Sequence, residues 1–381
     1  MSAEMTILLT GVFAATACAL VGTFLVLRRM AMMSDAISHA ILPGLVFAYF
    51  LANGPNLVVG VFGASLAGVV TVLLVEMLQR TGLVKSDAAI GIVFPALFAL
   101  GTFAVSRYFS DVHLDADAIL FGEIAFAPFD RLIIGGTDYG SQPMIVLACL
   151  TLLNAVLLGV FYKELKISTF DPGLAAALGF SPLVLHYGLM TLVSMTTVGA
   201  FSAVGAILVV ALMIVPAATA YLLTDRLPMM IAISVAAGIA SALSGYYLAV
   251  AVDVSISGMM TVTAGGLFML AALFSPSHGL LARSLRRGRT RRRFASDLLV
   301  MHLAHHQESS ESLESLASEL DWPRDWLAEV VQRSASEQTV TLKGSTVALT
   351  EQGRHDAQRI TRALDPTSDA AVTMSGGHPV A

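Results

Sequence analysis

Long apolar runs alternate with short polar segments over the first 280 residues of the chain. A helix needs about 20 consecutive apolar residues to cross the hydrocarbon core of a bilayer. Runs of about this length predict nine membrane-spanning helices, and because the second and sixth are the weakest, eight is the alternative. The predicted ranges are 5–27, 30–51, 57–78, 88–106, 143–162, 184–201, 204–223, 228–249 and 256–275. The predicted fold class of residues 1–280 is therefore an all-α polytopic membrane domain.

The pattern changes after residue 280, where apolar runs become short and charged residues become frequent. Residues 281–296 hold a run of arginines and are predicted to form a basic cytoplasmic linker. Helical spacing of apolar residues, followed by a hairpin signal, predicts a small α+β cytoplasmic domain over residues 297–364. Its predicted elements are helices at 298–306, 313–320 and 322–333, a hairpin of 340–342 with 347–349, and a helix at 350–364. This order resembles a winged-helix module, and residues 365–381 are predicted to be a disordered tail.

Composition and the distribution of basic residues support a membrane protein and give it an orientation. Hydrophobic residues make up 56% of the chain and charged residues 13%, against about 25% charged residues in soluble proteins. Cytoplasmic loops are enriched in Lys and Arg. We therefore expect a multi-pass protein of the cell membrane (inner or plasma), with the N-terminus outside and the C-terminus in the cytoplasm. This orientation puts in the cytoplasm the basic residues Arg28, Arg29, Arg80, Lys85, Lys163, Lys166, Arg226 and those of the stretch 283–293.

An acid and a histidine interrupt the second apolar run. Asp35 and His39 are four residues apart, so on a helix their side chains lie on one face, one turn apart. A charged group in the hydrocarbon core costs at least ~2.5–3.5 kcal/mol and needs a partner, and a divalent cation would satisfy both side chains. Pro43 has no N–H, so the carbonyl of His39 loses its helical hydrogen bond and becomes a further candidate ligand. The alternative is a purely structural hydrogen bond between Asp35 and His39.

The residues around this pair resemble a known family. The stretch from Arg28 to Ala40, with Pro43-Gly44 after it and Pro216-Ala217-Ala218-Thr219-Ala220 later, is similar to the zinc/manganese/iron permeases of ABC transporters. The resemblance implies that Asp35 and His39 are metal ligands on a transport path. It also implies that the chain is the membrane-spanning subunit of an ATP-driven importer of Mn, Fe or Zn. The metal would be the transported cargo, and no permanently bound cofactor is expected.

The resemblance also implies partners. The chain contains no Gly-x-x-x-x-Gly-Lys-Ser/Thr phosphate loop, which is the usual ATP-binding signature of such transporters. We therefore expect the chain not to be an enzyme itself and ATP hydrolysis to take place on a separate ABC ATPase subunit. A second permease subunit, either a copy or a paralogue, and an extracytoplasmic metal-binding protein are the other expected partners. Two permease subunits would offer two Asp and two His, a set of ligands suited to Mn(II), Fe(II) or Zn(II).

A short helix is predicted in the loop after the fifth span. Asp171 can cap it, Pro172 suits its first position, and Gly179 can end it in the left-handed conformation. The pattern Phe-Asp-x-x-x-Ala-x-x-x-Gly resembles the coupling segment of the family, which docks into a cleft of the ATPase. The resemblance therefore implies that four residues couple this chain to the ATPase, namely Phe170, Asp171, Ala175 and Gly179.

Two other functions stay open from the sequence alone. An ion-coupled secondary metal carrier would use Asp35 and His39 as a proton relay and would need no partner ATPase. A membrane-tethered DNA-binding regulator would bind DNA with the helix predicted at 322–333. We do not expect DNA binding, because this helix mixes basic with acidic side chains, namely Arg324 and Arg333 with Asp325 and Glu329. Three histidines of the same domain could bind a metal, although exposed histidines are more often solvated: His302, His305 and His306.

Overall fold

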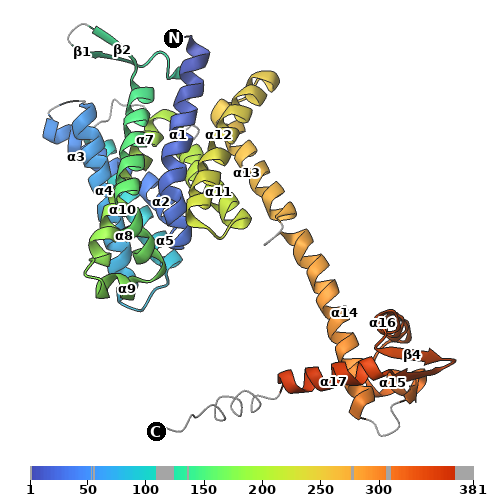
Figure 1. The fold of residues 1–381 in the computed structure, drawn as a ribbon. Coiled ribbons are helices and arrows are strands. Elements are labelled where there is room, and N and C mark those ends of the chain that lie inside the picture. Colours follow the sequence, from blue (N-terminus) through green and yellow to red (C-terminus); the bar gives the residue numbers. More distant parts are fainter. Residues whose placement is uncertain are drawn as a thin grey trace, which may run out of the picture. The chain divides into compact units, whose positions relative to one another are not determined.

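The chain forms two compact units, Met1–Leu280 and Leu281–Ala381, each with its own hydrophobic core (Figure 1). The computed structural model describes residues 2–52, 54, 56–108, 124–134, 137–275, 279–305 and 310–364. The tail predicted at 365–381 lies outside the described residues.

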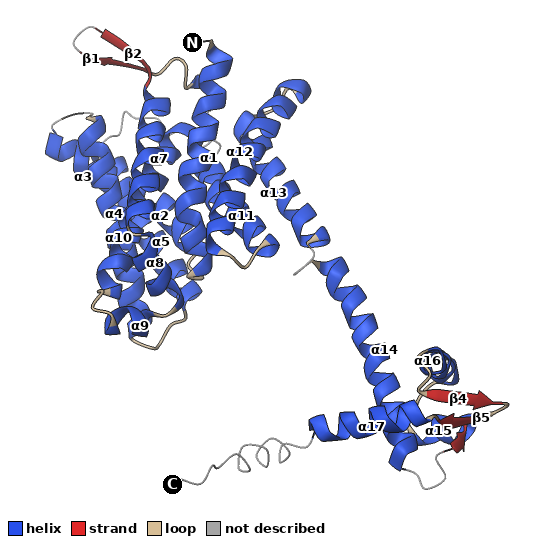
Figure 2. Cartoon of the chain, viewed as in Figure 1, coloured by secondary structure: helices blue, strands red, loops and turns tan. Residues whose placement is uncertain are grey.

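The first unit is a bundle of helices (Figure 2). They are α1 (Ala3–Leu27), α2 (Met32–His39), α3 (Ile41–Ala52), α4 (Leu57–Arg80), α5 (Ser86–Tyr108), α7 (Gln142–Val160), α8 (Tyr162–Phe170), α9 (Pro172–Ala177), α10 (Pro182–Val204), α11 (Ala206–Leu223), α12 (Leu227–Val252) and α13 (Ile256–Phe274). Among the described residues, eight helices are long and apolar enough to cross a membrane. The bent pair α2 and α3 makes a ninth if it is counted as one span. The predicted all-α polytopic fold is confirmed.

Helix α1 lies at the centre of the bundle, where it contacts α7, α10, α11 and α12. Its sequence is apolar on every side, as expected for a helix that is surrounded by other helices. Gly22 lets α11 approach α1 closely, because a Cβ atom at this position would meet the carbonyl oxygen of Met213. The hydrophobic effect does not drive helices together in lipid, so their association depends on the close van der Waals packing that small residues allow.

Helices α3 and α4 pack together through small residues as well. A Cβ atom on Gly44 of α3 would meet the carbonyl oxygen of Gly63 and the Cβ of Ala67, both on α4. A Cβ atom on Gly63 would in turn meet Ala48. Backbone contact of this kind leaves no room for sliding, so α3 and α4 form one rigid pair.

A hairpin precedes α7 and was not predicted from the sequence. The 3-10 turn η1 (Ile124–Phe126) is followed by β1 (Arg131–Ile134) and β2 (Thr137–Ser141), which pair antiparallel. Arg131 and Asp138 form an ion pair across the two strands. The guanidinium of Arg131 and the backbone N–H of Gly140 donate to this carboxylate and hold the pKa of Asp138 below its usual range.

The second unit is a small α+β fold. Its elements are α14 (Leu280–His305), β3 (Ser310–Ser312), α15 (Leu313–Glu319), α16 (Arg324–Ser336), β4 (Val340–Lys343), β5 (Thr346–Leu349) and α17 (Glu351–Leu364). The strands form one antiparallel sheet in the order β3-β5-β4. The four helices and the hairpin predicted for this region are confirmed, whereas β3 was not predicted. The likeness to a winged-helix module stays a prediction.

Residues 281–296, predicted as a linker, lie within α14. The helix runs from the arginine-rich stretch into the core of the second unit, where Ala295 and Leu299 are buried. Arginine is a good helix former, and the stretch contains no Pro that would end the helix. The predicted boundary at residue 296 therefore does not coincide with any break in secondary structure.

Candidate metal site

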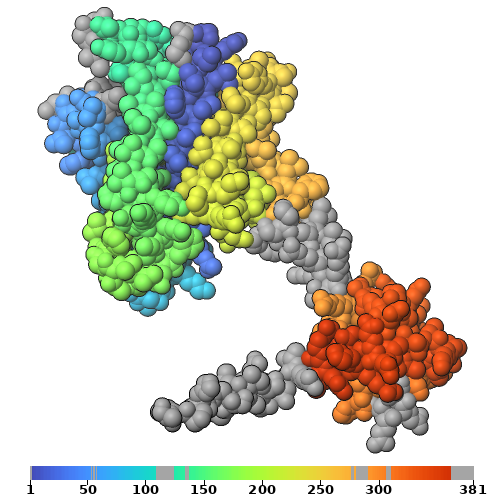
Figure 3. Space-filling view, viewed as in Figure 1, coloured from blue at the N-terminus to red at the C-terminus, as the bar shows by residue number. Residues whose placement is uncertain are grey.

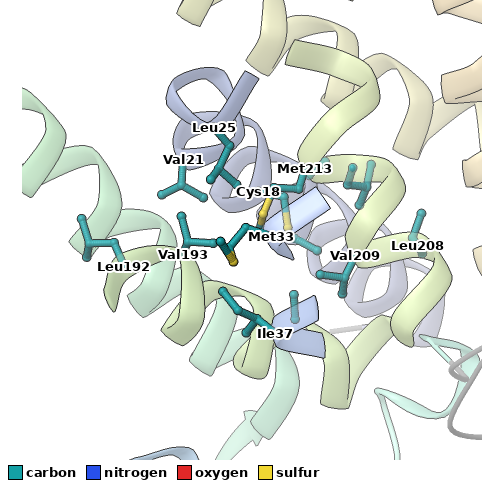
Figure 4. Packing of buried hydrophobic residues seen from close by; sticks show 14 of the residues in the cluster. Cys18, Val21, Leu25, Met33, Ile37, Leu192, Val193, Leu208, Val209 and Met213 are labelled. Carbon is teal, nitrogen blue, oxygen red and sulfur yellow. The ribbon is translucent and has the colours of Figure 1, made fainter. Parts of the chain in front are cut away.

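Helix α2 buries one face in the bundle core and carries the predicted metal pair on the other. The chain leaves α1 through Arg29, whose left-handed φ of 58° turns it into α2. Met33 and Ile37 of α2 are fully buried, and Figure 4 shows them among side chains of α1, α10 and α11, including Cys18 and Met213. This packing fixes the rotation of α2 about its axis. At 3.6 residues per turn, positions 35 and 39 must then point to the opposite side.

Asp35 and His39 meet on that side, as predicted. The Nε2 atom of His39 lies 3.5 Å from Oδ1 of Asp35, and each side chain is 33% exposed. This distance exceeds the ~2.7–3.2 Å of an ordinary N–H···O hydrogen bond. It is close to the separation of about 3.4 Å between two ligand atoms that bind one ion tetrahedrally at about 2.1 Å each. The spacing of the pair therefore fits two ligands of a shared ion.

Two aromatic rings of α5 cover the histidine. The ring centroid of Phe94 lies 5.5 Å from that of His39, and the centroid of Phe98 lies 6.4 Å away with the two planes perpendicular. Both are ordinary distances for aromatic pairs. The phenylalanine rings restrict the rotation of the imidazole, and they leave its Nε2 atom directed to Asp35.

The second span is broken beside His39. The sequence predicted one helix over 30–51 with a freed carbonyl at His39, but the helix ends at His39 and a new one begins at Ile41, bent by 40°. The N–H of Ala40 bonds back to the carbonyl of Ala36, which closes α2. Pro43 cannot donate to the carbonyl of His39, so the helix is interrupted where that bond would fall. The prediction of a continuous helix is wrong, whereas the loss of the bond at His39 follows from the proline itself.

A buried polar network lies where α1 ends, and it was not predicted. The guanidinium of Arg28 donates to Oγ1 of Thr169 at 3.1 Å and to Oγ of Ser168 at 3.0 Å, both on α8. A third nitrogen of Arg28 lies 3.3 Å from Nδ1 of His186 on α10. One arginine thus joins the end of α1, next to α2, with α8 and α10.

The network continues from α10 to α4. Nε2 of His186 lies against Oε1 of Glu76, where the two form an ion pair when the imidazole is protonated, and the hydroxyl of Tyr187 donates to Oε2 of Glu76 at 2.7 Å. The glutamate and histidine side chains are only 16% and 18% exposed. No local sequence signal could have paired Glu76 with His186 or Tyr187. Glu76 stands at the end of one apolar run, and Tyr187 lies 111 residues further along the chain. Only the packing of α4 against α10 brings them together.

The predicted coupling segment has the expected local structure. The Asp171 carboxylate accepts the N–H of Leu174 at 2.9 Å and caps α9, Pro172 is the first helical residue, and Gly179 has a left-handed φ of 87°. Ala175 is buried, whereas Phe170 is exposed. The segment lies at the surface at one end of the first unit, seen in Figure 3 as the light green patch.

Four exposed apolar side chains lie along this segment, and together they are called the apolar ridge: Phe170, Leu174, Leu178 and Phe180. Beside it, a groove of about 630 Å³ is lined by Lys166 and Phe170 on one side and by the start of α12 on the other, from Leu227 to Met229. Exposed apolar groups rimmed by charged residues are typical of protein interaction surfaces.

Three of the arginines that the structure describes in the second unit pair with glutamates. Arg324 of α16 pairs with Glu314 at 3.1 Å, and Arg333 pairs with Glu337 at 3.0 Å. Arg292 pairs with Glu329 of α16 at 2.7 Å. A helix that reads DNA presents its basic groups to phosphates and bases, and a carboxylate lies beside each of the α16 residues Arg324 and Arg333.

Comparisons with known proteins place these features in context. The sequence profile described as the ABC 3 transport family matches residues 3–275. The chain is 45% identical to the zinc transport system membrane protein TroD of Treponema pallidum, over 93% of this chain and 98% of that protein. It is 47% identical to the manganese transport system membrane protein MntD of Bacillus subtilis, over 75% of this chain and 97% of that protein.

A solved structure shares the fold of the first unit. It is described as PsaBC from Streptococcus pneumoniae in complex with Fab, and it aligns with a TM-score of 0.61 and 30% sequence identity. The alignment covers 74% of this chain and 94% of that one. The similarity to the Treponema protein covers 93% of this chain, more than the similarity to the Bacillus protein or to the solved structure. Because the first unit ends at Leu280, this similarity extends into the second unit.

Proposed function

Because the chain belongs to the ABC 3 transport family, we propose that it is the membrane-spanning subunit of an ATP-driven importer of divalent transition metal ions. The observation that carries this proposal is the Asp35–His39 pair, held on a short helix within an otherwise apolar span. Relatives are named as zinc, manganese and iron transport system membrane proteins, which supports Mn, Fe or Zn as the cargo. The comparisons give no support to an ion-coupled carrier or to a DNA-binding regulator.

The translocation path forms between two permease subunits. In the single chain, the side chains of Asp35 and His39 are each one-third exposed, and contact with lipid would be costly for both. A second subunit, either a copy or a paralogue, would cover this face and contribute its own Asp and His. Oxygen and nitrogen ligands in equal number suit Mn(II), Fe(II) and Zn(II) without selecting strongly among them.

The metal-ligand role is tested by Asp35→Asn and His39→Gln. Both changes keep size and hydrogen-bonding ability but remove the anionic or imidazole ligand. We expect each to abolish uptake of radioactive Mn or Zn by cells, while the complex still assembles and hydrolyses ATP. Thr102→Val on α5 is the matched control, because its hydroxyl donates within its own helix to the carbonyl of Phe98, and it should leave uptake unchanged. Near-normal uptake by both site variants would show that the pair is a structural hydrogen bond.

ATP hydrolysis takes place on separate ATPase subunits that dock on the segment from Phe170 to Gly179. The exposed apolar ridge and the neighbouring groove supply a surface for a protein partner. Arg28 ties the preceding helix α8 to the end of α1, so movement of the docked segment has a direct connection to the start of α2. An extracytoplasmic metal-binding protein delivers the metal at the other end of the bundle.

The docking surface is tested by Leu174→Glu. A carboxylate in the apolar ridge would have to be desolvated against the partner, so we expect loss of ATPase co-purification while the permease remains in the membrane. Ile133→Glu is the matched control, because this side chain is also apolar and exposed but lies on β1, and it should retain the ATPase. If Leu174→Glu retains full ATPase association, the docking surface lies elsewhere.

A further inference from the structure

Three side chains in the second unit converge although they come from three different elements. They are His302 of α14, Glu311 of β3 and Glu319 at the end of α15. The Nε2 atom of His302 lies 3.4 Å from Oε2 of Glu311 and 3.2 Å from Oε2 of Glu319. One ligand atom from each residue can be chosen so that all three lie within 4.8 Å of one another.

The fold of the unit forces this convergence. Glu311 is the cross-strand partner of Val347, and paired residues of adjacent strands point to the same face of a sheet. Val347 is fully buried in the core of the unit, so the glutamate is directed inward. The side chain of Glu311 is only 12% exposed, and both of its carboxylate oxygens are shielded from solvent. A strand that buries a glutamate in this way carries a desolvation cost that a bound cation can offset.

The two other residues are fixed by the same core. His302 lies between the buried Leu299 and Leu303 of α14, and its Nε2 atom is shielded from solvent. Glu319 follows the buried Leu316 by one helical turn, and its side chain is 43% exposed. The cluster therefore has two shielded ligands and one at the surface, so an ion could enter from the side of Glu319.

We propose that His302, Glu311 and Glu319 form a binding site for a divalent transition metal ion, distinct from the pair in the membrane. Two ligand atoms that each bind an ion at about 2.1 Å with a tetrahedral angle are about 3.4 Å apart, which matches the two measured separations from Nε2. Two carboxylates and one imidazole suit Mn(II), Fe(II) or Zn(II) and leave coordination positions for water. The two carboxylates together carry the charge that neutralises a dication.

The site rests on the second unit alone and does not depend on the proposed transport function. The metal is tested on the full-length protein carrying Asp35→Asn and His39→Gln, which removes the membrane pair as a competing site. Equilibrium dialysis against MnCl2 or ZnCl2, with the metal content measured by mass spectrometry, should find one ion per chain. Glu311→Gln and Glu319→Gln should each weaken binding by at least tenfold, because each removes one of three protein ligands. Glu314→Gln on α15 and His355→Gln on α17, both exposed, are the matched controls and should bind as the parent does.

A second measurement separates ligand loss from loss of folding. The two tryptophans of the chain, Trp322 and Trp326, both pack against the core of the second unit, so tryptophan fluorescence follows the unfolding of this unit in the intact protein. Metal that binds the folded state at about 100 times its dissociation constant should raise the melting midpoint by roughly 10–20 °C. Glu319→Gln should melt like the parent without metal, because its side chain is half exposed, and should show no rise with metal.

Two results would overturn the proposal. One is the absence of stoichiometric Mn or Zn binding by the parent protein, which would leave the cluster as an ion pair of His302 with the two carboxylates. The other is an equal metal-dependent rise of the melting midpoint in Glu319→Gln and in the parent, which would place the metal elsewhere in the unit. Failure of the membrane pair to bind metal would affect neither measurement.

Discussion

Replacing Glu76 by Gln should destabilise the transmembrane unit more when His186 is present than when it has been replaced as well. The two side chains are in direct contact between α4 and α10 and are less than one-fifth exposed. A hydrogen bond to a charged group contributes about 1.5–3 kcal/mol, whereas neutral side-chain hydrogen bonds within a membrane average only about 0.6 kcal/mol. Because this pair contains a carboxylate with little access to water, we expect a coupling free energy of about 1.5–3 kcal/mol.

The cysteines of the chain provide the assay. Cys18 of α1 is fully buried and Cys149 of α7 is exposed. In a Cys149→Ala background, a maleimide dye should therefore react only when the bundle opens around α1, and its fluorescence gives the melting midpoint. One kcal/mol corresponds to about 2–4 °C for a unit of this size. The summed losses of Glu76→Gln and His186→Gln should thus exceed the loss in the double variant by about 3–12 °C.

Arg80→Gln is the matched control for this experiment. Arg80 also pairs with Glu76, but at 3.7 Å and with its side chain 68% exposed. Such surface pairs contribute less than about 1 kcal/mol, so the corresponding double variant should be nearly additive. Additivity within about 0.5 kcal/mol for Glu76 and His186 would refute the reasoning, because it would mean that the buried pair contributes no more than the exposed one.

Three further predictions concern orientation, pH and DNA. Tyr139→Cys on β2 should be labelled by a membrane-impermeant maleimide in intact cells, and Leu83→Cys after α4 only in opened cells; the reverse would invert the orientation. Burial raises the pKa of Asp297 in α14 above the usual value of an aspartate. Folding therefore favours the protonated carboxyl, and this contribution to stability is lost as the pH rises from the pKa of the unfolded state through that of the folded state. Asp297→Asn should therefore raise the tryptophan melting midpoint at pH 7 but not at about pH 3, where the unfolded carboxyl is also protonated; an equal rise at both values would contradict this assignment. The intact protein should not retard duplex DNA in gel electrophoresis at physiological salt, because Arg324 and Arg333 are already paired; a retarded complex would show that these ion pairs open.

The sequence predicted those features that depend on neighbouring residues. The apolar runs located the spans, because helix length and hydrophobicity are properties of a continuous segment. Asp35 and His39 were expected on one face because a separation of four residues is one helical turn, and their side chains meet. The short helix α9 was predicted from Asp171, Pro172 and Gly179, since caps and left-handed glycines act within a few residues.

Features that depend on tertiary register could not be predicted in this way. Glu76 and His186 belong to different spans, and only the packing of α4 on α10 aligns them. His302 was named in the sequence as one of three histidines that could bind a metal or be solvated, but Glu311 could not be placed beside it, because the inward direction of Glu311 follows from the pairing of β3 with β5. The break at Ala40 was also missed, since Pro43 indicates a lost hydrogen bond but not whether the helix bends or ends there.

The break at Ala40 divides one span into two segments, α2 and α3, that pack against different helices. α2 is fastened by Met33 and Ile37 to the side chains of α1, α10 and α11, whereas α3 is locked to α4 through Gly44 and Gly63. Any change in the angle between α2 and α3 must be absorbed at Ala40, the single residue between them. Ala40 follows His39 directly, so such a change would first alter the orientation of the imidazole and of the carbonyl of His39.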